Sequence, residues 1–244
     1  MRLEILPDYP SLSRATADLI VHYLEKKNNS LICLASGHTP LGVFQCLIQD
    51  AKNKRVNFRE CIFVSLDEWL GIDPKQKGSC REMMDRDFFG PLQLGKEQIR
   101  FFNGMSTTPE KDCDTMNEFI ASHGSLDIML VGVGTNGHIA MNEPGTPFSS
   151  YAHVSTLADE TKKVGQKYFA SKTELSKGMT LGLCHLKESI LPIIMANGQK
   201  KSAIMKKALT IKATEQIPAS ICQLIPHGSI MIDLEAGREI NGNR

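Results

Sequence analysis

The chain has 244 residues, 41% of them hydrophobic, which is enough for one sizeable core. Its 28 Lys and Arg residues nearly balance its 27 Asp and Glu residues, so the net charge of +1 gives no general attraction to nucleic acid or membrane surfaces. The N-terminus lacks the long apolar segment of a signal peptide, and no apolar run approaches the roughly 18 residues that span a bilayer. We therefore expect a cytoplasmic protein with no nucleic-acid or membrane partner.

Apolar periodicity predicts alternating strands and helices along the whole chain. Strands are expected over residues 3–6, 30–35, 61–66, 99–102 and 127–131. Helices are expected over residues 10–24, 41–48, 79–89, 110–122, 161–169 and 199–209. Further apolar runs cover residues 179–183, 189–196, 220–225 and 229–232. This alternation favours an α/β fold, Rossmann-like and doubly wound, with a largely parallel sheet and helices on both faces. With no obvious linker, we treat residues 1–244 as a single domain.

The cysteines give no sign of a metal or disulfide framework. There are seven, they are scattered, and no C-x-x-C pair occurs among them. Most lie in apolar runs, which is typical of reduced core thiols. We therefore expect no bound metal.

Chemically distinctive residues follow four of the expected strands. They are Ser36-Gly37-His38-Thr39, Asp67-Glu68, residues 134–143 and Asn197-Gly198. In α/β sheets, ligands bind beyond the carboxyl ends of the strands. We therefore expect these four segments to converge on one pocket.

The turn at residues 36–39 leads into an expected helix and has the features of an anion site. Thr39 suits the N-cap and Pro40 the first helical position, while backbone N–H groups and two hydroxyls face the helix entry. An ordinary capped helix has the same pattern. Lys201 lies in the first turn of a later helix, where an anionic ligand would offset its unfavourable position in the helix dipole. An ordinary surface lysine would explain Lys201 equally well. From its neighbouring sequence alone, Lys167 is only a lysine in an expected helix.

Two acidic residues and a histidine are candidates for proton transfer. Asp67 and Glu68 directly follow a strand, where partial desolvation can raise a carboxyl pKa toward that of a useful base. His138 and Glu143 lie five residues apart in a glycine-rich turn, so Glu143 can orient the imidazole. The same local pattern would arise if Asp67 and Glu68 were solvent-exposed turn residues, or if His138 were a loop histidine hydrogen-bonded within the protein.

The glycines of that turn also spell G-x-G-x-x-G, the dinucleotide-binding pattern, at Gly132, Gly134 and Gly137. Polar residues follow Gly137 in place of a periodic apolar helix. Pro144 interrupts the stretch where the crossover helix would run. These features argue against a nicotinamide or flavin cofactor.

At these residues the chain resembles the glucosamine-6-phosphate deaminase (isomerase) family, which is related to 6-phosphogluconolactonase. The resemblance covers nearly the whole chain. Its motifs are Leu-Ala-Ser-Gly-His-Thr-Pro-Leu-Gly at 34–42, Leu-Asp-Glu-Trp-Leu-Gly at 66–71 and Gly-Val-Gly-Thr-Asn-Gly-His-Ile-Ala-Met-Asn-Glu-Pro at 132–144. The Asn142-Glu143-Pro144 ending favours the deaminase branch over the lactonases.

The resemblance implies a cofactor-free aldose–ketose isomerisation of an amino-sugar phosphate with loss of ammonia. It implies that Asp67 moves the proton between C2 and C1, that His138 opens the sugar ring and that Glu143 orients His138. Substrate and phosphate contacts are implied at Ser36, Gly37, His38, Thr39, Glu68, Gly134, Lys167 and Lys201. The expected partner is a small sugar phosphate, and a homo-oligomer is possible.

Departures from the family pattern leave several alternatives open. Asn136 stands where some members carry aspartate, which can shift the pKa of His138, and Lys167 stands where some carry arginine. His38 replaces a glycine or similar residue and leaves the amino-sugar epimer open, with glucosamine 6-phosphate as the first candidate substrate and galactosamine 6-phosphate as the second. A lactonase-type hydrolase and a non-catalytic sugar-phosphate sensor are the other candidates. A sensor would usually carry a DNA-binding segment, and the sequence shows no basic helix-turn-helix extension.

Overall fold

The computed structural model describes residues 1–241 and arranges their strands in two sheets. The strands are β1 (Arg2–Leu6), β2 (Leu31–Leu34), β3 (Ile62–Ser65), β4 (Asp67–Trp69), β5 (Ile99–Arg100), β6 (Ile128–Gly132), β7 (His153–Thr156), β8 (Lys177–Thr180), β9 (Leu191–Ala196) and β10 (Ser229–Asp233). The α-helices are α1 (Tyr9–Leu24), α2 (Leu41–Lys52), α3 (Cys80–Met84), α4 (Pro109–Ser122), α5 (Asp159–Gly165), α6 (Leu183–Glu188), α7 (Ser202–Thr210) and α8 (Arg238–Asn241). Shorter turns are the π-helical η1 (Asp85–Phe89) and the 3-10 helices η2 (Lys96–Gln98), η3 (Gln166–Tyr168), η4 (Gln199–Lys201) and η5 (Pro218–Leu224).

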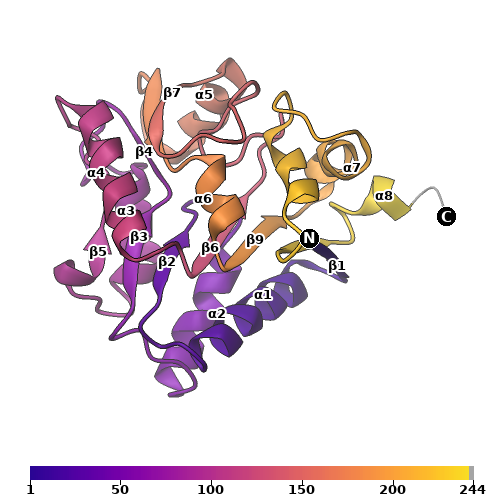
Figure 1. The fold of residues 1–244 in the computed structure, drawn as a ribbon, viewed down its shortest axis with the longest axis horizontal. Coiled ribbons are helices and arrows are strands. Elements are labelled where there is room, and N and C mark those ends of the chain that lie inside the picture. The colour runs from indigo at the N-terminus through magenta and orange to yellow at the C-terminus, as the bar shows by residue number, and fades with distance from the viewer. Residues whose placement is uncertain (242–244) are drawn as a thin grey trace.

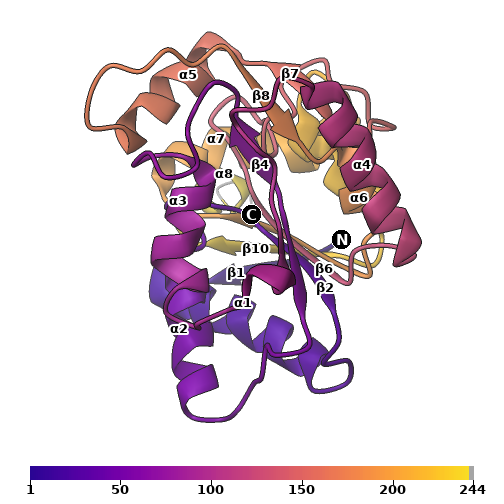
Figure 2. The same cartoon turned by 90° about the vertical axis from the view of Figure 1, so that its left-hand side faces the viewer.

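The larger sheet has seven strands in the order β1-β10-β9-β6-β2-β3-β5, and every neighbouring pair is parallel. Helices pack on both of its faces, as Figures 1 and 2 show from two directions. The predicted Rossmann-like, doubly wound α/β fold is therefore confirmed. The smaller sheet has the order β4-β8-β7 and is antiparallel.

Two of the three hydrophobic core clusters among the described residues lie on opposite faces of the larger sheet, because successive side chains of a strand point to opposite faces. From β2, Ile32 and Leu34 join a core with residues of α1 and α2, whereas Leu31 and Cys33 join a core with residues of α4, α6 and α7. A strand buried on both faces has an almost continuous apolar sequence. This is why the central strands were predictable.

The smaller sheet was not predicted. Its strands have three or four residues each, too few for a clear period, and two of them contain glycine or charged residues. Residues 220–224 of the 220–225 run lie in η5, and the helix expected over 161–169 is instead α5 followed by η3. Within residues 1–241, no helix is both long enough and apolar enough to cross a membrane.

The smaller sheet lies beyond the carboxyl end of the larger one. Leu66 alone separates β3 from β4, so the chain passes directly from one sheet to the other. The Leu181 N–H, just after β8, donates to the Leu66 carbonyl oxygen at 2.8 Å. Figure 2 shows β4, β7, β8 and α5 gathered at one end of the molecule, opposite α1 and α2. Residues that follow the central strands are therefore covered by this second layer.

Candidate active site

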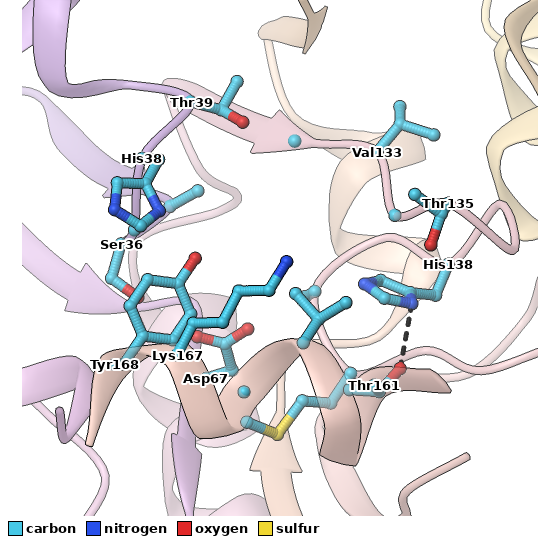
Figure 3. Close-up of a pocket in the computed structure, with 18 of the residues that line it drawn as sticks. Ser36, His38, Thr39, Asp67, Val133, Thr135, His138, Thr161, Lys167 and Tyr168 are labelled. Carbon is cyan, nitrogen blue, oxygen red and sulfur yellow. Dashed lines mark hydrogen bonds between the residues drawn. The ribbon is translucent and has the colours of Figure 1, made fainter. Parts of the chain in front are cut away.

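A cavity of about 660 Å³ lies where the larger sheet meets this second layer. Segments that follow β2, β3, β6 and β9 all reach it, so the expected convergence of four strand ends is confirmed. The predicted site residues that line it are Ser36, Gly37, His38, Thr39, Asp67, Gly134, His138, Lys167 and Lys201. Figure 3 shows Asp67, Lys167 and His138 directed toward the same space. Glu68, Asn136 and Glu143 are not among the lining residues.

The turn after β2 is held in shape from two sides. Gly37 has a φ of 86°, a conformation that glycine adopts without strain. The Tyr9 hydroxyl lies 3.0 Å from the Thr39 carbonyl oxygen and accepts the Gly42 N–H at 2.8 Å. The expected N-cap at Thr39 is wrong by one position, because Pro40 caps α2 and makes no side-chain capping bond. The Thr39 side chain is left to line the cavity.

The loop after β9 brings Lys201 to the cavity. Gly198 has a φ of 82°, and its N–H donates to both carboxyl oxygens of Asp233 at 3.0 Å. Asp233 also accepts the Ala236 N–H at 2.7 Å, so the end of β10 fixes the loop. Burial lowers the pKa of Lys201, and the charge of Lys167 lowers it further, while Glu160 acts in the opposite direction. Two ammonium groups close enough to affect each other favour an anion in the cavity.

Asp67 lies in β4 and faces the cavity. Burial raises the pKa of the Asp67 carboxyl to about 6, and the neighbouring Cys80 side chain acts to lower it. A carboxylate with this pKa is ionised at pH 7 and is more basic than an ordinary aspartate. The structure is therefore consistent with the predicted role as a base.

Glu68 points away from the cavity, so the predicted substrate contact needs correction. Its side chain follows that of Asp67 on a strand and therefore lies on the other side, where it is 0% exposed. Its oxygens accept the backbone N–H groups of Trp69, Cys80 and Arg81 at 2.8, 3.0 and 2.9 Å. Burial raises its pKa to about 7, while these three bonds act to lower it. Glu68 thus anchors the start of α3 and does not line the cavity.

The loop after β6 holds the His138 backbone, and Thr161 of α5 holds its ring. The His138 N–H donates to Asn136 Oδ1 at 3.0 Å, and Asn136 Nδ2 donates to Glu143 Oε2 at 3.1 Å. His138 Nδ1 lies 3.0 Å from Thr161 Oγ1 but 3.8 Å from Glu143 Oε2. The hydrogen-bond partner of the ring is therefore Thr161, and Glu143 acts on it at longer range. Asn136 supports both residues from outside the cavity.

Charge and burial act against each other on His138. Burial lowers its pKa, the positive charge of Lys201 lowers it further, and the carboxylates Glu143 and Glu160 raise it. The net direction is downward, so the imidazole is neutral at pH 7 and can accept a proton. Its ring lies directly above Gly134, where a Cβ atom would be 2.2–2.4 Å from three ring atoms. Gly134 is therefore required for the position of His138.

Lys167 and Tyr168 enter the cavity from η3, which follows α5. The Tyr168 ring stacks on His38, with centroids 5.2 Å apart and planes inclined by 26°. Figure 3 shows this pair at the Ser36 end of the cavity and Lys167 extended between it and His138. The lysine that locally looked like an ordinary helix residue thus lines the cavity.

Comparison with known proteins assigns the family. The family model described as glucosamine-6-phosphate isomerases/6-phosphogluconolactonase matches residues 9–230. The chain belongs to this family. A glucosamine-6-phosphate deaminase of Thermoanaerobacter pseudethanolicus is 31% identical over 237 residues, covering 97% of this chain and 94% of that protein. One of Shouchella clausii is 33% identical, with coverage of 97% and 96%. The resemblance inferred from the sequence motifs is confirmed.

Solved structures of the family agree over the whole fold. A monomeric glucosamine-6-phosphate deaminase superposes with a TM-score of 0.94 at 30% identity, covering 98% of this chain and all of that one. A 6-phosphogluconolactonase from Trypanosoma brucei superposes with a TM-score of 0.79 at 17% identity, covering 98% of each chain, and it shares the fold alone. The homo-oligomer considered from the sequence stays a prediction.

Several residues that line the cavity were not singled out as site residues from the sequence. They lie in short helices or in the unpredicted sheet and became recognisable only through their position. The further lining residues include Trp69, Cys80, Met83, Thr161, Val164 and Tyr168. Tyr9 and Asp233 shape the site from outside the cavity.

We expect Gly134→Ala to lower turnover by ~10²-fold or more, because the new methyl group displaces the His138 ring from its position beside a bound substrate. Gly134 has no left-handed φ, so alanine imposes no backbone strain there. Gly132→Ala is the matched control, since its Cβ would have ordinary contacts, 3.6 Å or more from Thr39. Steady-state rates of the two variants test this, and equal losses would contradict it.

Proposed function

We propose that the protein converts glucosamine 6-phosphate and water to fructose 6-phosphate and ammonia. The observation that carries this proposal is the meeting of Asp67, His138 and two lysines in one cavity. A carboxylate base and a neutral imidazole suit proton transfers, and the lysines suit a phosphate. The names of the family relatives support the same reaction.

The phosphate is held at one end of the cavity. The turn at residues 36–39 supplies two hydroxyls and backbone N–H groups near the N-terminus of α2. Lys167 and Lys201 supply two positive charges, which suit a dianion. Bringing the phosphate to these lysines also relieves the repulsion between them. This binding orients the sugar carbons toward Asp67 and His138.

Asp67 transfers the proton that changes the aldose into a ketose. The carboxylate removes a proton from C2 and returns it to C1 of the open-chain sugar, while the aldehyde oxygen gains a proton to become the C1 hydroxyl and the amino nitrogen loses one. C2 is thereby oxidised and C1 reduced within one molecule, so the electron balance is internal. With its pKa near 6, the Asp67 carboxyl is ionised at neutral pH and accepts the C2 proton more readily than an ordinary aspartate would.

His138 opens the sugar ring before that step. The neutral imidazole accepts the proton of the C1 hydroxyl and donates a proton to the ring oxygen, so the C1–O5 bond breaks and an aldehyde remains. Thr161 fixes the ring orientation, and Glu143 stabilises the transient imidazolium from 3.8 Å. Asn136 keeps Glu143 in place by donating to it.

Ammonia leaves in the last step. After C2 loses its proton and C1 gains one, the C2–N bond becomes an imine. Water adds at C2, the C–N bond breaks, and nitrogen departs as ammonia while C2 becomes the ketone of fructose 6-phosphate. The amino group of the substrate is therefore the source of the ammonia, and a lactone substrate could not release ammonia.

The direct test is ammonia release from a panel of compounds. Glucosamine 6-phosphate is expected to give ammonia and fructose 6-phosphate in equal amounts. If galactosamine 6-phosphate is the better substrate, the protein acts on that epimer instead. Hydrolysis of 6-phosphogluconolactone without ammonia release from either amino sugar would overturn the proposal in favour of a lactonase. Binding of these compounds without turnover would favour a sensor.

We expect Asp67→Asn to lower kcat by ~10²-fold or more with little change in KM, because the amide cannot accept the C2 proton. In the wild type, kcat/KM should fall as the pH drops below about 6, where Asp67 becomes protonated. Asp73→Asn, at an exposed turn residue, serves as the control. Near-normal turnover of Asp67→Asn would remove Asp67 from the mechanism.

Lys201→Ala is expected to raise KM by about 10–100-fold, the effect of losing one charged hydrogen bond, while kcat changes much less. The reason is that the lysine contacts phosphate in the ground and transition states alike. Lys207→Ala, on the exposed side of α7, should leave both constants near those of the wild type. Titration with inorganic phosphate gives a second readout. Unchanged phosphate affinity in Lys201→Ala would count against this role.

A further inference from the structure

A hydrogen bond that the proposed mechanism does not use joins α5 to the loop after β6. Thr135 Oγ1 donates to Glu160 Oε1 at 2.7 Å. The next residue of α5 is Thr161, whose Oγ1 lies 3.0 Å from His138 Nδ1. Two consecutive residues of α5 therefore contact the same loop, and one of these contacts is with the ring of His138. Figure 3 shows Thr135, His138 and Thr161 together at one end of the cavity.

Packing fixes the end of α5 better than its start. Only two of the seven residues of α5 are buried. One is Gly165 at the end of the helix, which packs so closely on Trp69 that a Cβ atom would lie 2.9 Å from the ring. At the start, Ala158 provides no side-chain cap, and its N–H donates to Glu143 Oε1 at 3.2 Å. A turn with few buried contacts is held mainly by its polar ones, and the Glu160 bond is the shorter of the two.

The other acidic residue of this turn makes no such contact. The side chain of Asp159 is 98% exposed, and it pairs with Lys162 of the same helix at 3.0 Å. Asp159 and Glu160 carry the same charge in the first turn of α5, where both suit the helix dipole. They differ in that Glu160 reaches across to the loop that carries His138.

We propose that Glu160 is a positioning residue for His138: by accepting the Thr135 hydrogen bond, it fixes the start of α5 on the loop and so keeps Thr161 against the imidazole ring. This inference rests on the proposed function, in which His138 opens the sugar ring. The imidazole must take a proton from one sugar oxygen and give one to another, so its orientation must be held while the substrate is bound. Glu160 is not among the lining residues of the cavity and acts through its neighbours.

The charge of Glu160 has an effect separate from its hydrogen bond. Burial lowers the pKa of both His138 and Lys201, and the negative charge of Glu160 opposes this shift on each. The same charge repels a phosphate held by Lys201. Removing the carboxylate should therefore leave phosphate affinity unchanged or raise it, whereas removing the hydrogen bond should impair proton transfer by His138. These opposite expectations allow the two effects to be measured apart.

The test compares Glu160→Ala, which removes the acceptor, with Glu160→Gln, which keeps an acceptor and loses the charge. In Glu160→Ala, kcat should fall about tenfold, the effect of losing one hydrogen bond, while inorganic phosphate binds at least as tightly as to the wild type. In Glu160→Gln, kcat should stay close to that of the wild type. An unchanged kcat in Glu160→Ala, or a loss of phosphate affinity together with kcat, would overturn the proposal.

Asp159→Ala is the matched control, because it removes an equal charge from the same turn without breaking a bond to the loop. Its kcat should remain near that of the wild type, and a loss equal to that of Glu160→Ala would contradict the proposal. Thr135→Val removes the donor of the same bond. A double variant of Thr135→Val and Glu160→Ala should lose no more activity than either single variant. Additive losses would show that the two side chains act independently.

A second readout does not depend on turnover. In nitrogen-15 NMR of the free protein, the Nδ1 resonance of His138 should move in Glu160→Ala and Thr135→Val and stay in place in Asp159→Ala. If the wild type releases no ammonia from any amino-sugar phosphate, the proposed function fails, and this measurement still decides whether Glu160 positions the ring. An unmoved resonance in an active enzyme overturns the role of Glu160 alone.

Discussion

The buried carboxyl group of Glu68 ties β4 to the start of α3. Glu68 accepts hydrogen bonds from the backbone N–H groups of Trp69, Cys80 and Arg81, which β4 and the start of α3 would otherwise leave unpaired. Burying a carboxyl group is costly unless hydrogen bonds compensate it, and here three do. Because neighbours on a strand point in opposite directions, the same geometry that turns Glu68 inward turns Asp67 toward the cavity. The position of the candidate base and that of the helix beside it are thus set together.

The sequence was informative where burial imposes a pattern. The central strands are apolar on both faces, so their runs and the polar residues after them, among them Asp67, His138 and Lys201, could be found by inspection. The smaller sheet could not, because β4 pairs with β8 through Asp67 and Thr180, more than a hundred positions apart in the chain. Cys80 and Thr161 could not be recognised as cavity residues for a related reason: the sequence does not show which side chains lie beside a single thiol or hydroxyl in the fold.

The glycine-rich loop shows how one pattern can serve two purposes. In a dinucleotide site, the glycines let the backbone approach a pyrophosphate at the start of a helix. In this protein, no α-helix begins between Gly137 and β7. Gly134 makes room for an imidazole ring, and Gly137, with a φ of 89°, turns the chain back so that the Gly134 N–H reaches the His138 carbonyl oxygen at 2.8 Å. Asn136 suits this loop because its amide accepts from His138 and donates to Glu143, which a carboxylate there could not do.

The strand order has a geometric consequence. Lys201, His138, the turn at residues 36–39 and Asp67 follow β9, β6, β2 and β3, which are consecutive neighbours in the sheet. Adjacent strands are about 4.8 Å apart, so these four segments leave the sheet over roughly 14 Å. The spacing of these strands therefore sets the length of a ligand that can contact all four segments at once. The strand spacing does not distinguish two ligands of equal length that differ at one hydroxyl, because such a difference is read only by the side chains that line the cavity, among which His38 and Tyr168 stack on each other.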